Sequence, residues 1–161
     1  MVKKKNMRED FLKLFNFVSK IRKIMSTSSV LYKGDLRCVS THLKSNTEIL
    51  TDAPIDNHGK GETFSPTDLV ATALANCMIT IMGIEANTLN VNIDGTFAEV
   101  TKVMGIGPRR ISKIVVKMTV PDNNLTEDQK QALIKAGLNC PVSKSLHPDL
   151  IQDVDIEFLK N

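Results

Sequence analysis

Three cysteines, Cys38, Cys77 and Cys140, are the residues of this 161-residue chain most able to do covalent chemistry. A reactive cysteine is held as its thiolate, which requires a cation, a helix N-terminus or a hydrogen-bond donor to lower a pKa of about 8.5. Cys140 precedes Pro141, a pair that predicts the N-cap of a helix, where free amides and the helix dipole favour a thiolate. Cys140 is therefore a candidate reactive thiol, although its neighbours offer it no partner.

Cys77 lies eleven residues inside a predicted helix that begins at Pro66, where the contribution of the helix dipole has faded. Asp68 is nine residues away, on the opposite side of that helix at 100° per residue, so it cannot touch the thiol. Any activating group must come from another element, and the long loop before the helix is the nearest candidate. On these grounds alone a buried core thiol is favoured for Cys77, and Cys38, in a predicted strand, is interpreted as structural.

Other kinds of catalytic or binding site are not predicted. The three histidines, His42, His58 and His147, are not at metal-ligand spacing with one another or with the cysteines, and there is no Cys-x-x-Cys pair. No Ser/His/Asp arrangement, phosphate loop or dinucleotide fingerprint occurs. We therefore expect no metal and no cofactor.

The charge of the chain is divided unevenly along its length. The net charge is +3 and the pI about 8.8. Residues 1–25 contain eight Lys and Arg against two acidic residues, a local charge of +6, so the remaining chain carries −3. Aromatic residues are 4% of the chain, with no Trp. A nucleic-acid-binding domain would carry its basic residues on the folded face, with aromatics for stacking, and is therefore not expected.

The N-terminal residues 1–28 are predicted to form a basic amphipathic leader, followed by one domain over residues 29–161. The apolar positions of the leader recur at three- and four-residue steps: Phe11, Leu14, Phe15, Val18, Ile21 and Met25. Such a helix binds a membrane surface or a partner, or it packs on its own domain or on a second subunit. The stripe of Phe and Leu favours packing on its own domain or on a second subunit. A third possibility is that Met25 is the true start.

No uninterrupted apolar stretch of the chain is typical of a signal peptide or a transmembrane span. We therefore expect no stable membrane insertion. Three widely spaced cysteines do not make a disulfide scaffold, and they favour a reducing, cytoplasmic location.

Periodicity and turn residues predict an α+β domain, because the strands, helices and hairpin do not alternate as β/α units. The predicted elements are one strand over 30–39, a strand over 49–51, a loop over 52–65, a helix from Pro66 to about Ala86, a hairpin of 91–104 and 110–120, a helix from Thr126 to near Gly137, a short helix from Pro141 and a strand over 154–159.

The helix from Pro66 has a thin polar stripe and a wide apolar side. The stripe is Asp68, Thr72, Asn76 and Thr80, and the apolar side is Val70, Ala73, Leu74, Cys77, Ile81 and Ile84. So narrow a polar stripe predicts a central helix that is covered on most sides.

Two motifs resemble a known family. The run SPTDLVATALANCMITIMGIEA over 65–86 is followed, 63 residues after Cys77, by CPVSKSL over 140–146. This pair is similar to the OsmC/Ohr family of thiol-dependent peroxide reductases, and the resemblance covers roughly residues 30–160. It implies an α+β fold that forms an intertwined homodimer, with long central helices packed between antiparallel sheets and the active sites at the subunit interface.

The resemblance also implies roles for two cysteines and reverses the interpretation of Cys77. Cys77 would attack the O–O bond of an organic hydroperoxide and become a sulfenic acid, and Cys140 would resolve it to a disulfide that an external dithiol reduces. The partners so implied are a second copy of the chain, the hydroperoxide and the dithiol.

One departure from the family concerns the activation of Cys77. The peroxidases of the family have an Arg in the loop and a Glu directly after the Pro that opens the central helix, but Thr67 follows Pro66 here. Possible substitutes are Arg37, His58 or Lys60 as the cation and Glu62 as the acidic orienter; Arg37 could equally be a solvated strand charge. The alternative function is a non-catalytic OsmC-like dimer that binds a small hydrophobic ligand in a cavity around Cys77.

Overall fold

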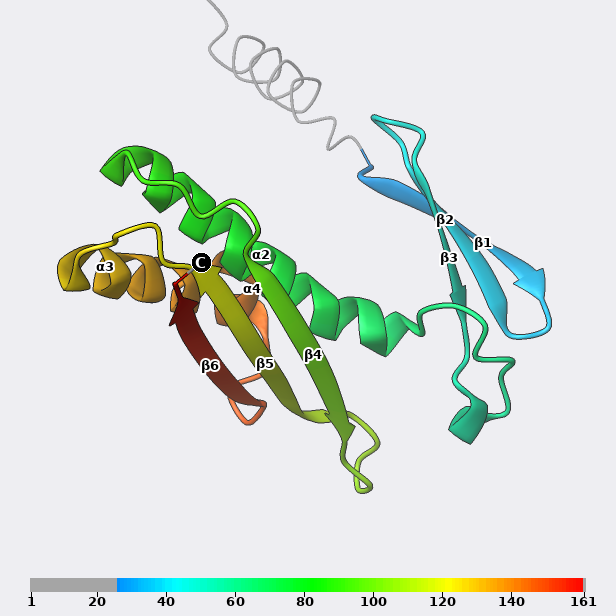
Figure 1. Ribbon diagram of the computed structural model, residues 1–161. Coiled ribbons are helices and arrows are strands. Elements are labelled where there is room, and N and C mark those ends of the chain that lie inside the picture. Colours follow the sequence, from blue (N-terminus) through cyan, green and yellow to red (C-terminus); the bar gives the residue numbers. More distant parts are fainter. Residues whose placement is uncertain (1–25, 161) are drawn as a thin grey trace, which may run out of the picture. The chain divides into compact units, whose positions relative to one another are not determined.

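The computed structural model describes residues 26–160, so the predicted leader helix lies outside the described residues. The chain divides into two units, Met1–Leu50 and Thr51–Asn161 (Figure 1). In chain order the elements are β1 (Ser28–Gly34), β2 (Arg37–His42), β3 (Glu48–Asp52), the 3-10 helix η1 (Ile55–Asn57), α2 (Pro66–Leu89), β4 (Phe97–Met104), β5 (Ile111–Pro121), α3 (Glu127–Leu138), α4 (Pro141–Ser145) and β6 (Ile151–Leu159).

The first sheet has the order β1-β2-β3, and β1 and β2 form an antiparallel hairpin. One continuous strand over 30–39 was therefore a wrong prediction. Asp35 and Leu36 both have positive φ, 51° and 60°, as in the type I′ turns that match the twist of two paired strands. Leu36 is an unusual residue for such a turn, so the sequence lacked the Asn-Gly or Asp-Gly signal that marks it. The predicted strand over 49–51 is confirmed as β3.

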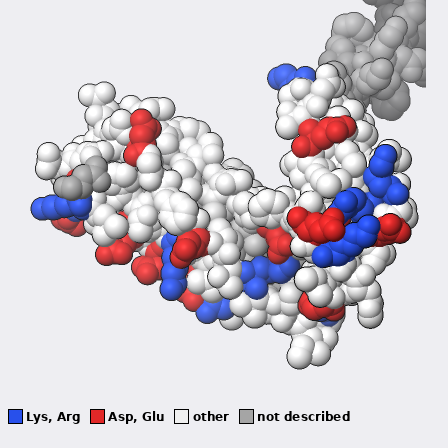
Figure 2. Space-filling model, turned by 45° about the vertical axis from the view of Figure 1, so that its right-hand side comes forward, with Lys and Arg blue, Asp and Glu red and all other residues white. Residues whose placement is uncertain are grey.

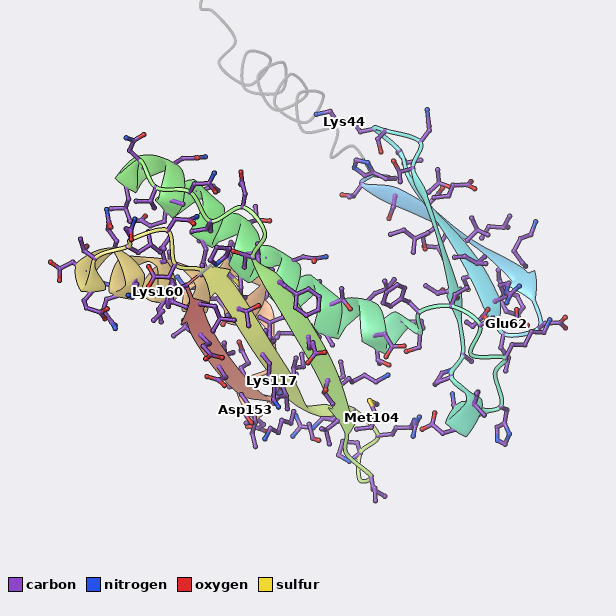
Figure 3. The ribbon with its side chains drawn as sticks, in the orientation of Figure 1. Lys44, Glu62, Met104, Lys117, Asp153 and Lys160 are labelled. Atoms are coloured by element: carbon purple, nitrogen blue, oxygen red, sulfur yellow. The ribbon has the colours of Figure 1, made fainter. Side chains whose placement is uncertain are left out.

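The second sheet has the order β4-β5-β6, and α2, α3 and α4 lie on one of its faces (Figure 1). The predicted hairpin is confirmed, with β4 beginning at Phe97 rather than Val91. β6 pairs with β5 in parallel, so this sheet is mixed, and the expectation of antiparallel sheets was wrong for it. The inward side chains of β5 are buried as its alternation predicts: Ile114, Val116, Met118 and Val120. Lys117 and Asp153 lie on the opposite, solvated face (Figure 3).

The start of α2 is fixed by a capping box. Ser65 Oγ accepts a hydrogen bond from the backbone N–H of Asp68 at 3.1 Å, and the Asp68 carboxylate accepts one from the Ser65 N–H at 2.7 Å. Pro66 occupies the first helical position, where its missing N–H costs nothing. The predicted helix is confirmed and runs to Leu89, where Asn90 with φ 53° ends it.

Only one face of α2 is buried within the chain. The buried residues are Ala71, Leu74, Ala75, Met78, Met82 and Ala86. Val70 and Ile84, which the apolar side was expected to bury, are 40% and 57% exposed. α2 packs against α3, β4, β5 and α4. Helix α2 is long and apolar enough to cross a bilayer by length and composition alone, which the sequence argument overlooked, but central helices of soluble domains meet the same criterion.

Candidate active site

Cys77 and Cys140 come together in the second unit. Cys77 lies three turns into α2 and is partly exposed, whereas Cys140 is the N-cap residue of α4 and is fully buried. Because α4 packs against α2, the two side chains come close enough for Cys77 to act on the pKa of the Cys140 thiol. Both sulfurs are free thiols. The fold therefore brings together two cysteines that are 63 residues apart in the sequence.

The pKa of the Cys140 thiol is raised above its ordinary value. Burial is the largest cause, and the hydrogen bond with Cys77 and the negative charge of Cys77 add to it. Hydrogen bonds from the backbone amides of Ser143 and Val142 act in the opposite direction but do not outweigh these effects. The expectation that the helix N-terminus favours a Cys140 thiolate was therefore wrong in its net effect, because α4 has only five residues and the thiol is fully buried.

Both cysteines lie at the apolar core of the second unit. Cys140 belongs to the buried core of the second unit, and Cys77, Ile81, Val142 and Leu146 pack against that core. Apolar surroundings suit a substrate with an organic group, and they limit the access of water to an oxidised sulfur.

The position of Cys140 depends on contacts between α4 and β6. The backbone N–H of Ser143 donates to Cys140 Sγ at 3.4 Å. The Ser143 hydroxyl donates to Gln152 Oε1 at 2.7 Å, and Gln152 Nε2 donates to the Ser143 carbonyl at 3.0 Å. The side-chain amide of Gln152 thus holds the residue whose N–H contacts the thiol.

A second polar cluster lies at the start of α2. Lys102 Nζ forms an ion pair with Asp68 at 2.7 Å and donates to Thr67 Oγ1 at 2.8 Å and Ser65 Oγ at 3.2 Å. The resemblance placed Thr67 where the family's peroxidases carry Glu. Burial by itself raises the pKa of Asp68, but hydrogen bonds from Lys102 and Ser65 outweigh it and lower the pKa below 3.8. Lys102, with these three contacts, ties β4 to the N-terminus of α2.

Two cavities flank α2. One, of about 470 Å³, lies beside the first turns of the helix and is lined by Glu62, Lys102 and their neighbours. The other, of about 380 Å³, lies near the C-terminal end and is lined by Thr80, Ile84 and their neighbours. Cys77 lines neither of them. Neither is therefore the cavity around Cys77 that the ligand-binding alternative requires.

The candidates for activating Cys77 lie on several elements. Arg37 is on β2 in the first unit, and Cys77 is in the second. Glu62 is on the loop before α2 (Figure 3), where its backbone N–H donates to Asp52 Oδ2 at 3.1 Å. His58 follows η1 in the left-handed conformation, with φ 63°, and Lys60 is exposed two residues later. The roles of Arg37 and Glu62 in catalysis stay predictions.

The sequence reasoning missed Asp68, Lys102 and Gln152, although each left a signal. Asp68 comes three residues after Ser65, at the capping-box position. Lys102 and Gln152 occupy positions of β4 and β6 that face the helices, where their neighbours at two-residue steps are apolar. A polar side chain in an inward register must find a hydrogen-bonding partner, and both residues do.

No metal centre is found among residues 26–160: they contain no group of three or more His, Cys, Asp or Glu side chains that could hold an ion.

An α+β domain with a cysteine on its central helix, beside a second cysteine at the start of a short helix, defines a protein with a paired-thiol site. The family model described as OsmC-like protein matches residues 59–152, and the chain therefore belongs to the OsmC-like family. The family predicted from the two cysteine motifs is confirmed.

Solved structures agree with this assignment. A protein from Psychrobacter arcticus 273-4, described as an osmotic stress induced and detoxification response protein, is 53% identical, with a TM-score of 0.79 over 83% of this chain and 96% of its own. An organic hydroperoxide resistance protein OsmC from Legionella pneumophila is 17% identical, with a TM-score of 0.59 over 83% of this chain and 98% of its own.

An organic hydroperoxide resistance protein from Elizabethkingia anophelis is 15% identical, with a TM-score of 0.66 over 85% of this chain and 99% of its own. At these identities the last two matches support the shared α+β fold alone. No curated protein matches the chain.

Proposed function

We propose that this protein reduces organic hydroperoxides with a thiol pair in which Cys77 is the attacking residue and Cys140 the resolving residue. The observation that carries the proposal is that α2 and α4 bring the two cysteines together, close enough for Cys77 to act on the pKa of the Cys140 thiol. Membership of the OsmC-like family and the hydroperoxide resistance named for two similar structures also support it.

The chemistry runs in three balanced steps. The Cys77 thiolate attacks the distal oxygen of the hydroperoxide; an S–O bond forms, the O–O bond breaks, and the alkoxide takes up a proton and leaves as an alcohol. The Cys140 sulfur then attacks the sulfenic sulfur; an S–S bond forms, the S–O bond breaks, and the hydroxide leaves as water with the proton of Cys140. An external dithiol returns both cysteines to thiols by exchange.

The raised pKa of Cys140 fits this division of labour. A thiol with a raised pKa keeps its proton and is a poor nucleophile, which suits the residue that acts second. Cys77 is also the more exposed of the two sulfurs, as a residue that meets the substrate first must be. Arg37 and Glu62 are kept in the proposal as the cation and the acidic orienter near Cys77.

We propose further that the protein works as a homodimer with its sites at the subunit interface. Residues 28–52 form a three-stranded sheet in which no apolar side chain is buried, and its buried residues are the polar Thr51 and Asp52 at the end of β3. Val30, Leu31 and Tyr32 are 60–65% exposed, and successive strand residues point to opposite faces, so both faces of that sheet need cover. In the second unit α2 leaves Val70 and Ile84 exposed, and in Figure 2 much of the visible face of this unit carries no Lys, Arg, Asp or Glu side chain.

The proposed location is the cytoplasm, where reducing partners keep a catalytic thiol pair in its reduced form. The three free cysteines are compatible with such a compartment.

Thiol counting under denaturing conditions tests the proposed reaction. With limiting cumene hydroperoxide, the wild-type protein should lose two thiols for each hydroperoxide consumed and regain them with dithiothreitol. Mass spectrometry should find the new disulfide between Cys77 and Cys140. Cys77→Ser should consume hydroperoxide no faster than buffer, because the attacking sulfur is gone.

Cys38→Ser is the matched control, since it also removes one thiol but lies on β2 outside the pair. It should consume hydroperoxide at the wild-type rate. If Cys77→Ser stays as active as the wild type, the proposed reaction is wrong.

A further inference from the structure

The side chain of Gln152 is placed in an unusual way for a residue near the start of a strand. It faces the helices from β6, in a register whose other members are Val154, Ile156 and Phe158. Its amide makes two hydrogen bonds, and both go to Ser143 of α4: Oε1 accepts from the hydroxyl at 2.7 Å, and Nε2 donates to the carbonyl at 3.0 Å. An amide that uses both its ends on one residue holds that residue in position and orientation.

Ser143 is in turn the residue that contacts the Cys140 sulfur. Its backbone N–H donates to Cys140 Sγ at 3.4 Å. In a five-residue helix the intrahelical bonds alone are too few to fix this geometry. The Gln152 side chain also satisfies the Ser143 carbonyl, one of the acceptors that a helix C-terminus leaves open. The contacts run from β6 through α4 to the thiol.

We propose that Gln152 is a positioning residue for the resolving step. By its hydrogen bonds to Ser143 it holds the backbone N–H of Ser143 against the Cys140 sulfur, and it holds Cys140 in position to attack Cys77. This inference rests on the proposed function, because it concerns the second step of that reaction. The residue touches neither sulfur and takes no part in bond breaking.

The Ser143 contact matters most after Cys77 has been oxidised. In the reduced protein the hydrogen bond and the charge of Cys77 help to raise the pKa of Cys140. A Cys77 sulfenic acid is neutral, so the effect of its charge disappears, and burial is then opposed by the backbone amides of Ser143 and Val142. Cys140 attacks as a thiolate, and the alignment of the Ser143 amide helps to set how readily that thiolate forms.

Closure of the disulfide by diamide tests the inference without a peroxide. The Cys77 thiolate adds to the N=N bond, and the other nitrogen takes up a proton from water. The Cys140 thiolate then attacks the Cys77 sulfur, the S–S bond forms, the S–N bond breaks, and the departing nitrogen takes up a second proton to leave as the hydrazine. In Gln152→Ala, closure should be about tenfold slower than in the wild type, the size expected for the loss of hydrogen bonds worth about 1.4 kcal/mol. The adduct of Cys77 should accumulate, because its formation is unaffected.

The control variants separate positioning from general stability. Gln131→Ala removes an exposed Gln from α3 and should close at the wild-type rate. Ser143→Ala, which loses the hydroxyl bond to Gln152, should slow closure, and Ser143→Thr, which keeps a hydroxyl, should restore it. A variant that is only less stable would not change the ratio of adduct formation to closure.

The same variants are then treated with cumene hydroperoxide, and the Cys77 sulfenic acid is trapped with dimedone. Equal closure by diamide in the wild type and Gln152→Ala would overturn the positioning role, whatever the protein does with peroxides. Slow closure in Gln152→Ala supports it even if no variant consumes hydroperoxide, an outcome that would instead contradict the proposed function.

Discussion

The two thiols of the proposed site differ in burial, and this difference assigns their roles. Cys140 is fully buried and its pKa is raised, so it keeps its proton while Cys77 is oxidised. Cys77 is partly exposed on the side of α2 that meets α4. The proposed attacking residue is therefore the more accessible cysteine, and the proposed resolving residue is the buried one beside it.

Replacing Cys140 by Ser should stop the reaction after its first step. Cys77 should still attack the hydroperoxide, but no sulfur is left in reach to displace the hydroxide. The protein should gain about 16 Da as a sulfenic acid and, with excess peroxide, about 32 Da as a sulfinic acid. Intact-mass spectrometry and dimedone trapping measure both species.

Cys38→Ser should show neither added mass under the same limiting peroxide, because its Cys77–Cys140 pair can still close. If Cys140→Ser forms an intramolecular disulfide as fast as the wild type, Cys140 is not the resolving residue.

At this scale the family resemblance pointed to Cys77 and Cys140, whereas reasoning from the residues alone favoured a core thiol for Cys77 and did not predict the surroundings of either sulfur. The Cys140-Pro141 pair predicted the N-cap of a short helix, and α4 confirms it. The sign of the net effect on the Cys140 thiol could not be predicted, because it depends on burial by α2 and on the neighbouring Cys77. The contacts of Gln152 with Ser143 depend on the parallel pairing of β6 with β5, and no local pattern in the sequence predicted this pairing.

At the scale of elements, α2 is the part that the sequence predicted best. Ser65-Pro66 marks its start because a hydroxyl cap and a proline without an N–H both suit the first turn. Its end and its exposed face were less accurate, since the core it packs on is built by β4, β5 and α3. The β1–β2 turn was missed because a Leu occupies one of its positive-φ positions.

Lys102→Met should weaken the attachment of α2 to β4. The substitution keeps the length of the stem but removes the ammonium that contacts Asp68, Thr67 and Ser65. The free energy of unfolding should fall by about 1 kcal/mol, a value already reduced for screening because Asp68 is 39% exposed. Urea denaturation at neutral pH measures it. Lys113→Met, which removes an ion pair with Asp153 on the more exposed face, should change stability less.

The stabilisation by Lys102 should depend on pH in a direction set by Asp68. The folded-state pKa of Asp68 is lowered from 3.8, so its stabilising effect is complete above the unfolded value and is lost as pH falls through the folded value. The difference between wild type and Lys102→Met should therefore persist from neutral pH down to about pH 4 and shrink below it. A difference that stays constant to pH 2 would show that Asp68 is not the partner that matters.

For the whole molecule, the surfaces left uncovered are as informative as the buried core. The three-stranded sheet of residues 28–52 buries no apolar side chain and so has no hydrophobic core of its own. Helix α2 buries one face and leaves Val70 and Ile84 exposed on another, although most of its residues are apolar. The periodicity of the sequence predicted which faces of the helices and strands are apolar. It could not predict whether such a face is buried by the same chain or by a second copy.

Ile84→Glu should break the proposed dimer. Ile84 is 57% exposed on α2, and a Glu there would carry an unpaired charge into the interface that we propose covers this face. The dimer dissociation constant should rise at least about tenfold, which light scattering after gel filtration can measure over a dilution series.

Ile106→Glu is the matched control, because Ile106 is 99% exposed at the tip between β4 and β5, so its replacement should leave the dimer intact. A monomeric wild type would contradict the proposed dimer. A dimer that Ile84→Glu leaves unchanged would show that this face of α2 is not in the interface. If the sites depend on both subunits, Ile84→Glu should also slow hydroperoxide consumption in proportion to the fraction of monomer, whereas Ile106→Glu should not.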